Sequence, residues 1–495
     1  MRRIAVLALL APVLAAAGCG GSKGASGPLD EGLRYLPADA PFAVAIDTKV
    51  SDGQYKAADD VARKFGSSGL VEQELKQLFK GGGRVDFDRD VKPLLGNPFV
   101  VGAPDPATFG RSGEPNSFVG AIETKDGGKL NDLVKKDGAK QKGEQSGAKV
   151  YEDSTGNTFA VKGDVLVVAG SRKLLDDALS RHGGSDTLTE DKFDSALGGL
   201  PKDALVRSYL NLESLLRSSP SGRQATKVKW VAALRTLGLV GQARSGSAGI
   251  AFNLKTDSAG LTDKDLPIAS GDAAPKVVQR AGELSLGLRD PGQIVDFALG
   301  AASAIEGPVV DVGERQLEGQ LGIDVETDIR RQLTGDASIE ITAAGRFGIR
   351  AAVKDPAAFK KTLAKVAGAL PRVLQFIGAG PMELSKPKAG EDFYALAQPD
   401  GGSIVFGVSH GVLVISNDPA RARGLATASP TAVSGAKGSL VLSADAEKLA
   451  NSIRRQLGPL LSLSGGLSTR PLGDLTGSVK TTTSGMKGSL ELKFD

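Results

Sequence analysis

An internal repeat constrains the fold of this chain more than any single motif does. The segment Val85–Gly96 (VDFDRDVKPLLG) returns as Ile323–Gly335 (IDVETDIRRQLTG), with acidic and apolar residues in step. Further pairs of similar segments follow in the same order, beginning at Phe118 and Phe347, beginning at Lys149 and Asp392, and ending at Asp257 and Asp495. Each second member lies roughly 240 residues after the first, and chance similarity between isolated apolar runs would not preserve both order and spacing. The sequence therefore predicts two tandem copies of one domain.

The repeat also sets the expected domain boundaries. A chain of 495 residues has room for about two to four domains, each able to bury a substantial core. We predict one copy over residues 33–262 and the second over residues 275–495. Residues 263–274 are the predicted linker, within a stretch from Ser258 to Pro275 that is rich in Ser, Gly, Asp and Ala.

Within each copy, an alternating apolar strand repeatedly runs through a capping residue into an amphipathic helix. In the second copy, Ile349–Val353 is followed by Asp355 and Pro356, and then by apolar residues at helical spacing. Asp355 can accept amide protons from the first helical turn, and Pro356 suits the first helical position. The same Asp-Pro pair begins at Asp290 and at Asp418. We therefore expect a helix after each of the three pairs.

Other predicted strands follow one another directly. TFAVKG and DVLVVAG, from Thr158 to Gly170, meet at a Gly-Asp turn and predict a hairpin. In the first copy, Phe42–Asp47 and Tyr209–Leu212 are predicted strands that lead into helices. Mixed hairpins and strand-to-helix steps indicate an α+β fold class, with mixed or antiparallel sheets covered by helices on one face.

The N-terminus, Met1–Cys19 (MRRIAVLALLAPVLAAAGC), has the order of a secretory signal: two arginines, an apolar run, small residues and then the only cysteine. A bacterial lipoprotein signal is similar, because its enzymes need small residues before the cut and a thiol at the new N-terminus. Ala16 stands where such signals most often have leucine. We predict a signal peptide over residues 1–18, lipidation of Cys19, and anchoring on the extracytoplasmic face of a cell membrane. The alternatives for Cys19 are a buried structural thiol and an unmodified residue.

The segment after the signal is predicted to be a tether. The apolar run is about 14 residues long, which is short of the roughly 20 that span a bilayer, so removal of the signal is favoured. Residues 19–32 are the predicted lipidated N-terminus and flexible tether, because Gly20–Pro28 (GGSKGASGP) can bury nothing. The folded part is expected to begin near Leu33. One cysteine cannot form an internal disulfide, so the apolar core alone must hold the fold.

Charge and aromatic content narrow the possible partners. The chain has 61 Lys and Arg against 57 Asp and Glu, so its formal charge of +4 falls to +2 when Arg2 and Arg3 leave with the signal. No basic stripe is interleaved with aromatic residues, so nucleic-acid binding is not expected. The lysines from Lys135 to Lys149 are diluted by Gly, Gln and Glu and indicate a solvated loop. Aromatic residues make up only 5% of the chain, which disfavours a sugar-binding surface.

Three segments carry a resemblance to a known family: Tyr35–Asp47 (YLPADAPFAVAID), Asp90–Gly96 (DVKPLLG) and Val165–Leu179 (VLVVAGSRKLLDDAL). They look like the uncharacterised bacterial family named domain of unknown function 3352. The likeness spans nearly the whole chain after the signal, and it is weaker in the second copy, which lacks the Leu-Pro-x-Asp-Ala element. Members of that family are exported or membrane-attached proteins without an assigned activity. The resemblance therefore implies a fold and a compartment but no catalytic residues.

Residues that carry chemistry are scarce. With two histidines and one cysteine in the chain, the usual ligand sets for zinc, haem or iron-sulfur clusters cannot be assembled, so we expect no metal and no cofactor. His182 is predicted at a helix C-terminus and His410 in a surface turn, and a structural role is favoured for both. No Gly-x-Ser-x-Gly elbow or phosphate loop is present, and Gly81–Gly83 lack a preceding strand. We therefore expect no catalytic residues and no enzyme.

One acidic cluster has two interpretations. Asp86, Asp88 and Asp90 have the spacing of the first ligands of a calcium loop, but Val91 replaces the required glycine and Asn97 the bidentate glutamate. We favour helix capping by Asp86 or Asp88, with the remaining acids near the positive end of the helix. The second copy repeats the trio as Asp324, Glu326 and Asp328.

Three functions remain as hypotheses, and no ligand-binding residue is assigned from the sequence. A non-catalytic binding or scaffold lipoprotein fits the missing catalytic set best, with an envelope protein or a small ligand bound where the copies meet. A carrier of apolar ligands such as lipids would need an apolar cavity. A carboxylate-based hydrolase, such as a glycoside hydrolase, is least favoured because aromatic residues are scarce. The long loop Pro104–Asn116, which has little counterpart in the second copy, is either functional or merely mobile.

Overall fold

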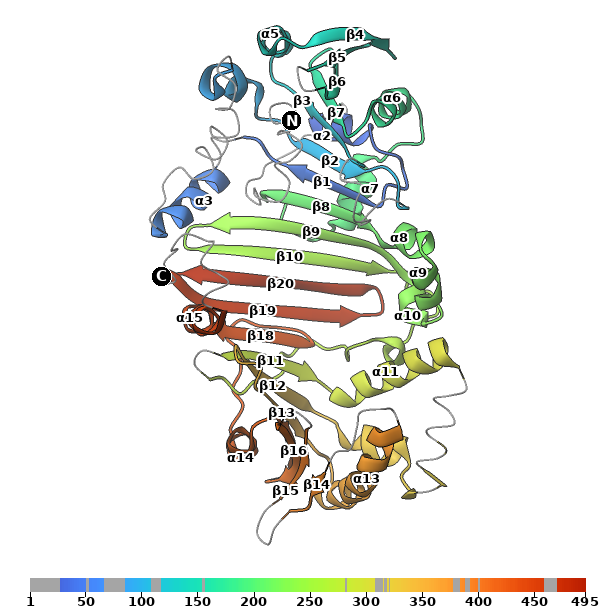
Figure 1. Cartoon of the computed structure of the whole chain (residues 1–495), viewed down its shortest axis with the longest axis vertical. Helices are drawn as coiled ribbons and strands as arrows, with labels where there is room; N and C mark the ends of the chain where they lie inside the picture. Colours follow the sequence, from blue (N-terminus) through green and yellow to red (C-terminus); the bar gives the residue numbers. More distant parts are fainter. Residues whose placement is uncertain are drawn as a thin grey trace. The chain divides into compact units, whose positions relative to one another are not determined.

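The structure is a computed structural model of the chain (Figure 1). It describes residues 27–49, 53–65, 85–107, 117–153, 156–280, 283–307, 315, 318–319, 321–376, 383–387, 392–398, 401–457 and 470–495. The predicted signal, Cys19 and most of the predicted tether lie outside the described residues, as do Gly81–Gly83 and most of the loop Pro104–Asn116. None of the helices in the described part of the chain has the length and apolar character needed to cross a membrane.

The chain divides into two compact units. Unit 1 comprises the chain up to Gln224 together with Leu234–Thr256, and unit 2 comprises Ala225–Ala233 and Asp257–Lys493. Both units combine helices with antiparallel strands, so the predicted α+β class is confirmed, and the sheets are antiparallel rather than mixed.

The strands of unit 1 pair in the order β4-β5-β6-β7-β3-β2-β1-β8-β9-β10, and every pair is antiparallel. Their bounds are β1 Phe42–Ile46, β2 Phe99–Ala103, β3 Val119–Glu123, β4 Lys140–Gln145, β5 Ala148–Glu152, β6 Thr158–Lys162, β7 Val165–Ala169, β8 Val206–Asn211, β9 Leu234–Arg244 and β10 Ser247–Thr256. The predicted hairpin between β6 and β7 is confirmed.

Helices cover both faces of the central strands of unit 1, whereas cover on one face was predicted. On one face, α2 (Pro28–Leu33), α6 (Arg172–Arg181) and α7 (Glu190–Ala196) pack on a core that includes Val100. On the other face, α5 (Gly127–Asp137) and η2 (Lys92–Leu94) pack on a core that includes Val101. The uninterrupted apolar runs of β2 and β7 are typical of strands buried on both faces. The other helices of this part of the chain are α3 (Gly53–Lys64), η1 (Phe87–Val91), α8 (Leu212–Ser218) and α9 (Pro220–Ala225).

Residues 28–32, which the sequence analysis placed at the end of the tether, belong to the helix α2. Pro28 occupies the first position of α2, and Leu29 and Leu33 are buried in the core of unit 1. Asp30 accepts a hydrogen bond from the backbone amide of Glu190 at 3.1 Å. Two leucines four residues apart share one helix face, and this short apolar pattern follows the Gly- and Ser-rich stretch directly.

The segment from Lys135 to Lys149 forms the end of α5 and most of a hairpin, not the solvated loop that its composition indicated. β4 and β5 pair across a two-residue turn in which Ser146 and Gly147 have φ values of 52° and 76°. Among the described strands, β4 pairs with β5 alone, and nearly all its side chains are exposed. Lysines and other polar residues are typical of a sheet edge that is protected from pairing with other chains.

The strands of unit 2 pair in the order β14-β15-β16-β17-β13-β12-β11-β18-β19-β20. The strand bounds are β11 Glu283–Arg289, β12 Asp336–Thr342, β13 Phe347–Ala352, β14 Leu384–Ser385, β15 Phe393–Ala397, β16 Ser403–Ser409, β17 Val412–Ser416, β18 Leu440–Asp445, β19 Leu472–Thr482 and β20 Gly485–Phe494. The helices are α10 (Lys229–Ala232), η3 (Asp263–Asp265), α11 (Pro291–Glu306), η4 (Val325–Ile329), η5 (Arg330–Gln332), α13 (Pro356–Phe376), α14 (Pro419–Thr427) and α15 (Ala446–Leu457). Matched strand by strand, this order is that of unit 1.

All three predicted Asp-Pro helices form, but one of them is capped differently. The Asp355 carboxylate accepts from the amides of Ala357 and Ala358, and the Asp418 carboxylate caps α14 in the same way. Asp290, in contrast, has a φ of 43°, and its side chain makes no cap hydrogen bond. The Gly292 amide donates instead to the backbone carbonyl of Leu333 at 3.0 Å. A tertiary contact therefore replaces the local cap predicted at Asp290.

The predicted linker, residues 263–274, is packed onto unit 2. Leu266 is fully buried. The Gln293 side-chain amide of α11 donates to the backbone carbonyls of Asp263, Lys264 and Leu266, at 3.1, 3.1 and 2.7 Å. Unit 2 thus buries one apolar residue of this segment and provides a hydrogen-bond donor to three of its carbonyl groups. The polar composition of the segment did not predict this packing.

Candidate functional site

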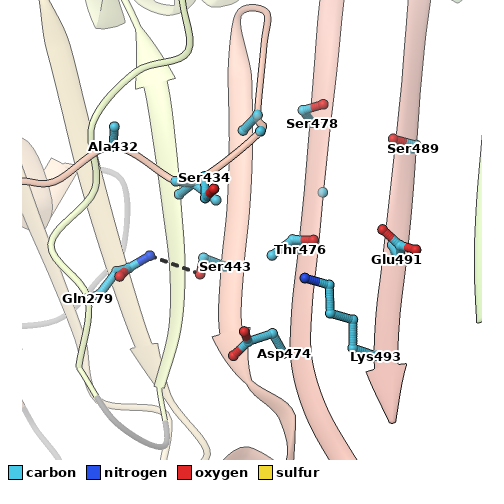
Figure 2. Close-up of a pocket in the computed structure, with 14 residues that line it drawn as sticks. Gln279, Ala432, Ser434, Ser443, Asp474, Thr476, Ser478, Ser489, Glu491 and Lys493 are labelled. Atoms are coloured by element: carbon cyan, nitrogen blue, oxygen red, sulfur yellow. Dashed lines mark hydrogen bonds between the residues drawn. The ribbon is translucent and has the colours of Figure 1, made fainter. Parts of the chain in front are cut away.

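A polar groove in unit 2 is the candidate binding site. It has a volume of about 470 Å³, which lies within the range of small-molecule sites. The loop Ala432–Ala436 lines one side, and side chains from the neighbouring strands line the other (Figure 2). These side chains, with Gln279, are polar or charged: Ser443, Asp474, Thr476, Ser478, Ser489, Glu491 and Lys493. We refer to this set of residues as the polar groove.

The alternation of side chains along a strand explains the rows of polar groups in the polar groove. Side chains two residues apart point to the same face. One row comes from β19 and one from β20, and Figure 2 shows the two rows side by side, with Asp474, Thr476 and Ser478 beside Ser489, Glu491 and Lys493. Ser443 on β18 lies opposite Thr476 in the β18–β19 pairing and adds a third hydroxyl-bearing strand.

The loop side of the polar groove is held in place by the core of unit 2. Val433 is 6% exposed and packs in one apolar cluster with Val277 and Val441. Beside it, Thr431 and Val277 form an isolated antiparallel bridge with backbone hydrogen bonds of 2.8 and 2.9 Å. The Gln279 amide donates to the Ser443 hydroxyl at 3.0 Å, as the dashed line in Figure 2 shows. These contacts preform the wall of the groove.

Two charged groups of the polar groove have no ionic partner in the part of the chain that the structure describes. The Asp474 carboxylate and the Lys493 ammonium group are exposed, and neither takes part in a side-chain hydrogen bond or ion pair with another described residue. In contrast, two nearby lysines of the same region are paired, Lys480 with Asp272 and Lys448 with Asp445. Both unpaired groups are therefore available to a ligand.

The lining of the polar groove offers many hydrogen-bond donors and acceptors. Hydroxyl groups both donate and accept hydrogen bonds, and the amide, carboxylate and ammonium groups add directed donors and acceptors. No histidine or cysteine lines the groove. Over the described residues, no group of three His, Cys, Asp or Glu side chains is arranged to hold a metal ion.

His182 follows α6, as predicted, but its surroundings were not foreseen. The Nε2–H group donates to Glu31 Oε1 at 2.8 Å, and Lys162 Nζ donates to Nδ1 at 3.3 Å. The imidazole stacks on the Tyr35 ring, with centroids 4.3 Å apart. Burial lowers the pKa of His182, against the raising effect of Glu31 and with the lowering effect of Lys162. This contact attaches the N-terminal helix α2 to the rest of unit 1, and none of its residues lines the polar groove.

His410 lies in the turn between β16 and β17, as predicted, with a φ of 51°. Its Nδ1 atom lies 3.0 Å from the hydroxyl of Ser409. Gly411 also has a positive φ, so the pair forms a two-residue hairpin turn on the surface. The neighbours give His410 a local structural role.

The acidic trios cap helices, as we favoured. In unit 1, Asp86 Oδ1 accepts from the Arg89 amide at 2.9 Å, and Asp90 accepts from the Asp86 amide at 2.7 Å. In unit 2, Asp324 Oδ1 accepts from the Thr327 amide, and Asp328 accepts from the Asp324 amide, both at 3.0 Å. Each trio thus closes a reciprocal capping arrangement at the start of a short helix.

The sequence analysis assigned no residue of the polar groove. The alternating Ser, Thr and charged residues of β19 and β20 were a usable signal, because one face of each strand is polar throughout. Their combination with Gln279 and with the loop Ala432–Ala436 depends on the order of strands in the sheet, which the local pattern does not show.

A model of a family described as protein of unknown function, DUF3352, matches residues 3–365. The chain belongs to the DUF3352 family. The match covers unit 1 and extends into α13 of unit 2, and it confirms the family resemblance carried by Tyr35–Asp47 and the other segments. Apart from Gln279, the polar groove of this DUF3352 protein is built from residues C-terminal to the matched region.

No curated protein matches the sequence of this DUF3352 protein. Among solved structures, crystal form I of TP0453 is similar at 14% identity and a TM-score of 0.26, over 49% of this chain and 83% of that chain. Crystal form III of TP0453 is similar at 11% identity and a TM-score of 0.26, over 47% of this chain and 82% of that chain. We draw no conclusion about fold or function from similarity this weak.

Proposed function

We propose that this DUF3352 protein is a lipid-anchored, non-catalytic binding protein on the extracytoplasmic face of a cell membrane, and that unit 2 takes up a polar ligand in the polar groove. The lining of the groove carries the proposal. Its hydroxyl, amide and charged side chains can hold a ligand through many hydrogen bonds, and the residues Ala432–Ala436 add backbone groups. The groove offers no activated nucleophile, because no histidine or cysteine lines it.

The lining also favours a polar ligand over the apolar ligands of the alternative hypothesis. A lipid carrier needs a cavity lined by apolar side chains, since burial of an acyl chain is what drives binding. The only large aliphatic side chain of the polar groove is Val433, which is already buried in the core. No aromatic side chain lines the groove, which disfavours a glycoside hydrolase site there.

The two units are proposed to be tandem copies of one domain, as the sequence repeat indicates. Two observations support this proposal. The strands of the two units pair in corresponding orders, and the trios that begin at Asp86 and Asp324 make matching capping hydrogen bonds. Duplication followed by divergence would leave one copy free to acquire a binding groove.

The anchor is proposed to be diacylglycerol on Cys19, supported by the order of residues in Met1–Cys19. Cys19→Ser should leave a folded protein that moves from the detergent phase to the aqueous phase on cell fractionation. Ser22→Ala is the matched control and should remain in the detergent phase. Retention of the Cys19→Ser protein in the detergent phase contradicts the anchor.

Native mass spectrometry of the protein purified from its own cell envelope tests the ligand class. A polar small molecule of fixed mass, lost on Thr476→Val substitution in the polar groove, supports the proposal. A co-purifying acyl lipid overturns it in favour of the apolar carrier. A bound molecule that survives the Thr476→Val substitution places binding elsewhere.

A further inference from the structure

We infer that the ligand of the polar groove is a zwitterion of the amino-acid or short-peptide class, bound by its free amine and its free carboxylate. The inference rests on the proposed function and adds to it the charge pattern of the ligand. It comes from Asp474 and Lys493, which place opposite charges in one groove, and from the hydroxyl groups that line the same groove.

Asp474 and Lys493 stay apart although they share the polar groove. In Figure 2 the Lys493 side chain runs from β20 toward Thr476, and the Asp474 side chain lies lower in the view, two residues before Thr476 on β19. Within the described part of the chain, no ion pair joins the two groups. An ammonium group and a carboxylate held apart in this way match a ligand that carries both opposite charges.

Uncharged donors and acceptors line the space around these two charges. The hydroxyls of Ser443, Thr476, Ser478 and Ser489 can donate to a ligand carboxylate and accept from a ligand amine. The Gln279 amide donates to Ser443 Oγ, so that hydroxyl keeps its own proton for another acceptor. A peptide unit, with one N–H donor and one C=O acceptor, suits such mixed lining.

The size of the polar groove suits a short ligand. Its volume of about 470 Å³ exceeds what a single amino acid fills and is within the small-molecule range. Because Asp474 and Lys493 are both exposed, solvent screens their charges, and each ligand charge adds at most about 1 kcal/mol to binding. The affinity is therefore set by the two charges together with the hydroxyl contacts.

Isothermal titration of the full mature chain with blocked and unblocked dipeptides tests the inference. The probes are alanyl-alanine, N-acetyl-alanyl-alanine, which lacks the free amine, and alanyl-alanine amide, which lacks the free carboxylate. We expect each blocked form to bind roughly fivefold more weakly than the free dipeptide, the change that the loss of about 1 kcal/mol produces. Glycerol, which carries hydroxyls but no charge, should not compete.

Variants assign each charge to its residue. Lys493→Met should abolish the preference for the free carboxylate and keep the preference for the free amine, and Asp474→Asn should do the reverse. Lys487→Met is the control, because Lys487 is an exposed lysine of the same strand that does not line the groove. It should leave all three affinities unchanged.

The outcomes separate this inference from the proposed function. Equal binding of the three dipeptides, or stronger binding of a blocked form, overturns the zwitterion. Absence of dipeptide binding combined with a different polar molecule in native mass spectra overturns the zwitterion and leaves the polar binding protein standing. An acyl lipid in those spectra overturns both.

Discussion

At one equivalent strand position, unit 1 has a glycine and unit 2 has a buried glutamate. In unit 1, Gly102 of β2 lies opposite Ala43 and Val119 on the neighbouring strands. In unit 2, Glu340 of β12 lies opposite Ser285 and Gly348. Because the strand orders correspond, Gly102 and Glu340 are equivalent positions. One carries no side chain, and the other carries a carboxylate that is fully buried.

In unit 1, apolar groups fill the space over Gly102. A Cβ atom at Gly102 would lie 2.6 Å from Leu36 Cδ1, so the leucine packs directly on the glycine. The helix α2 brings Leu33 and Leu36 into the same core. Leu174, the third residue after the α6 cap Ser171, packs against that core as well. The result is a dry cover over the sheet.

In unit 2, an ionic cluster fills the equivalent space. Arg421 Nη1 donates to Glu340 Oε2 at 2.8 Å, and the Arg421 guanidinium also makes two hydrogen bonds to the Glu283 carboxylate, at 2.5 and 2.7 Å. Arg280 Nε lies 3.3 Å from Glu340 Oε1. Arg421 is the third residue after the α14 cap Asp418, the position that Leu174 holds in unit 1.

The same arrangement of strands can therefore be covered either by apolar side chains, as at Gly102, or by a buried ionic cluster, as at Glu340. Apolar cover stabilises through burial, whereas a buried ionic cluster is stable only while every member is paired. Adding a charge at this position should therefore lower the unfolding free energy of unit 1. Removing a charge from the cluster should lower that of unit 2. The predictions below follow from this difference.

The largest effect is expected for Gly102→Glu, which places the residue of unit 2 into unit 1. The new carboxylate would meet Leu36 and the backbone carbonyl of Phe42 and would find Leu174 where unit 2 has an arginine. We expect unit 1 to lose about 4 kcal/mol or more of unfolding free energy. Hydrogen-exchange mass spectrometry of peptides from β1 to β3 measures the loss. Gly53→Glu, at a glycine with open space around it, is the control. Unchanged protection in Gly102→Glu contradicts the packing of Leu36.

Glu340→Ala should produce the next largest effect, in unit 2. Its removal leaves Arg280 without its buried partner and takes from Arg421 one of its two carboxylate partners, which costs about 3 kcal/mol. Urea unfolding followed by Trp230 fluorescence measures it, because the only tryptophan belongs to unit 2 and packs on Phe297 of α11. The double variant Glu340→Met with Arg421→Leu, which imitates the apolar cover of unit 1, should recover part of the loss. A double variant less stable than Glu340→Ala would show that the apolar solution does not fit unit 2.

The sequence allowed the helix starts and the acidic caps to be predicted, because each depends on residues close together in the chain. The capping hydrogen bonds of Asp355 and Asp86 span three residues or fewer. The ionic cluster could not be predicted. Glu340 lies in ASIEIT, where an acid between apolar residues indicates a solvent-facing position, and only α14 turns that position into a buried one.

The polar groove and the start of the fold were missed for related reasons. The groove combines Gln279 with residues more than 150 positions later in the chain, so that no local window contains it. α2 is a short helix whose apolar pattern consists of Leu29 and Leu33. Its stability comes from the core on which it packs. Both features depend on contacts between residues far apart in the chain, which a local sequence pattern does not contain.

One buried group in each unit, His182 in unit 1 and Glu340 in unit 2, should contribute opposite pH dependences to stability. Burial lowers the pKa of His182 in unit 1, so the unfolded chain binds this proton more readily. The contribution of His182 to stability is therefore present above about pH 6.5 and is lost as the pH falls through the folded pKa. Burial raises the pKa of Glu340 in unit 2, although Arg280 and Arg421 oppose the shift. Its contribution is present below about pH 4.5 and is lost as the pH rises through the folded pKa.

Unfolding at a series of pH values between 4 and 8 tests this contrast, with hydrogen exchange for unit 1 and Trp230 fluorescence for unit 2. His182→Gln should flatten the dependence of unit 1 and leave unit 2 unchanged, and Glu340→Gln should do the reverse. The difference between each variant and the wild type isolates the named group from Glu123, whose pKa is also raised by burial. Equal slopes in the wild type and in His182→Gln would contradict the role given to this histidine.

The smallest effects concern a feature that the two units keep in common. Asp86 and Asp324 cap their helices with equivalent hydrogen bonds, of 2.9 and 3.0 Å. Asp86→Ala should lower the stability of unit 1, and Asp324→Ala that of unit 2, each by about 1 kcal/mol. Asp88→Ala is the control, because Asp88 lies inside η1 and does not cap it.

If the caps were the remains of a calcium site, calcium would stabilise the wild type and chelator would lower its melting temperature. We expect neither change, because acidic side chains of each trio already accept hydrogen bonds from backbone amides at the start of their own helix. Unequal costs for Asp86→Ala and Asp324→Ala would show that the two units have diverged even at their caps.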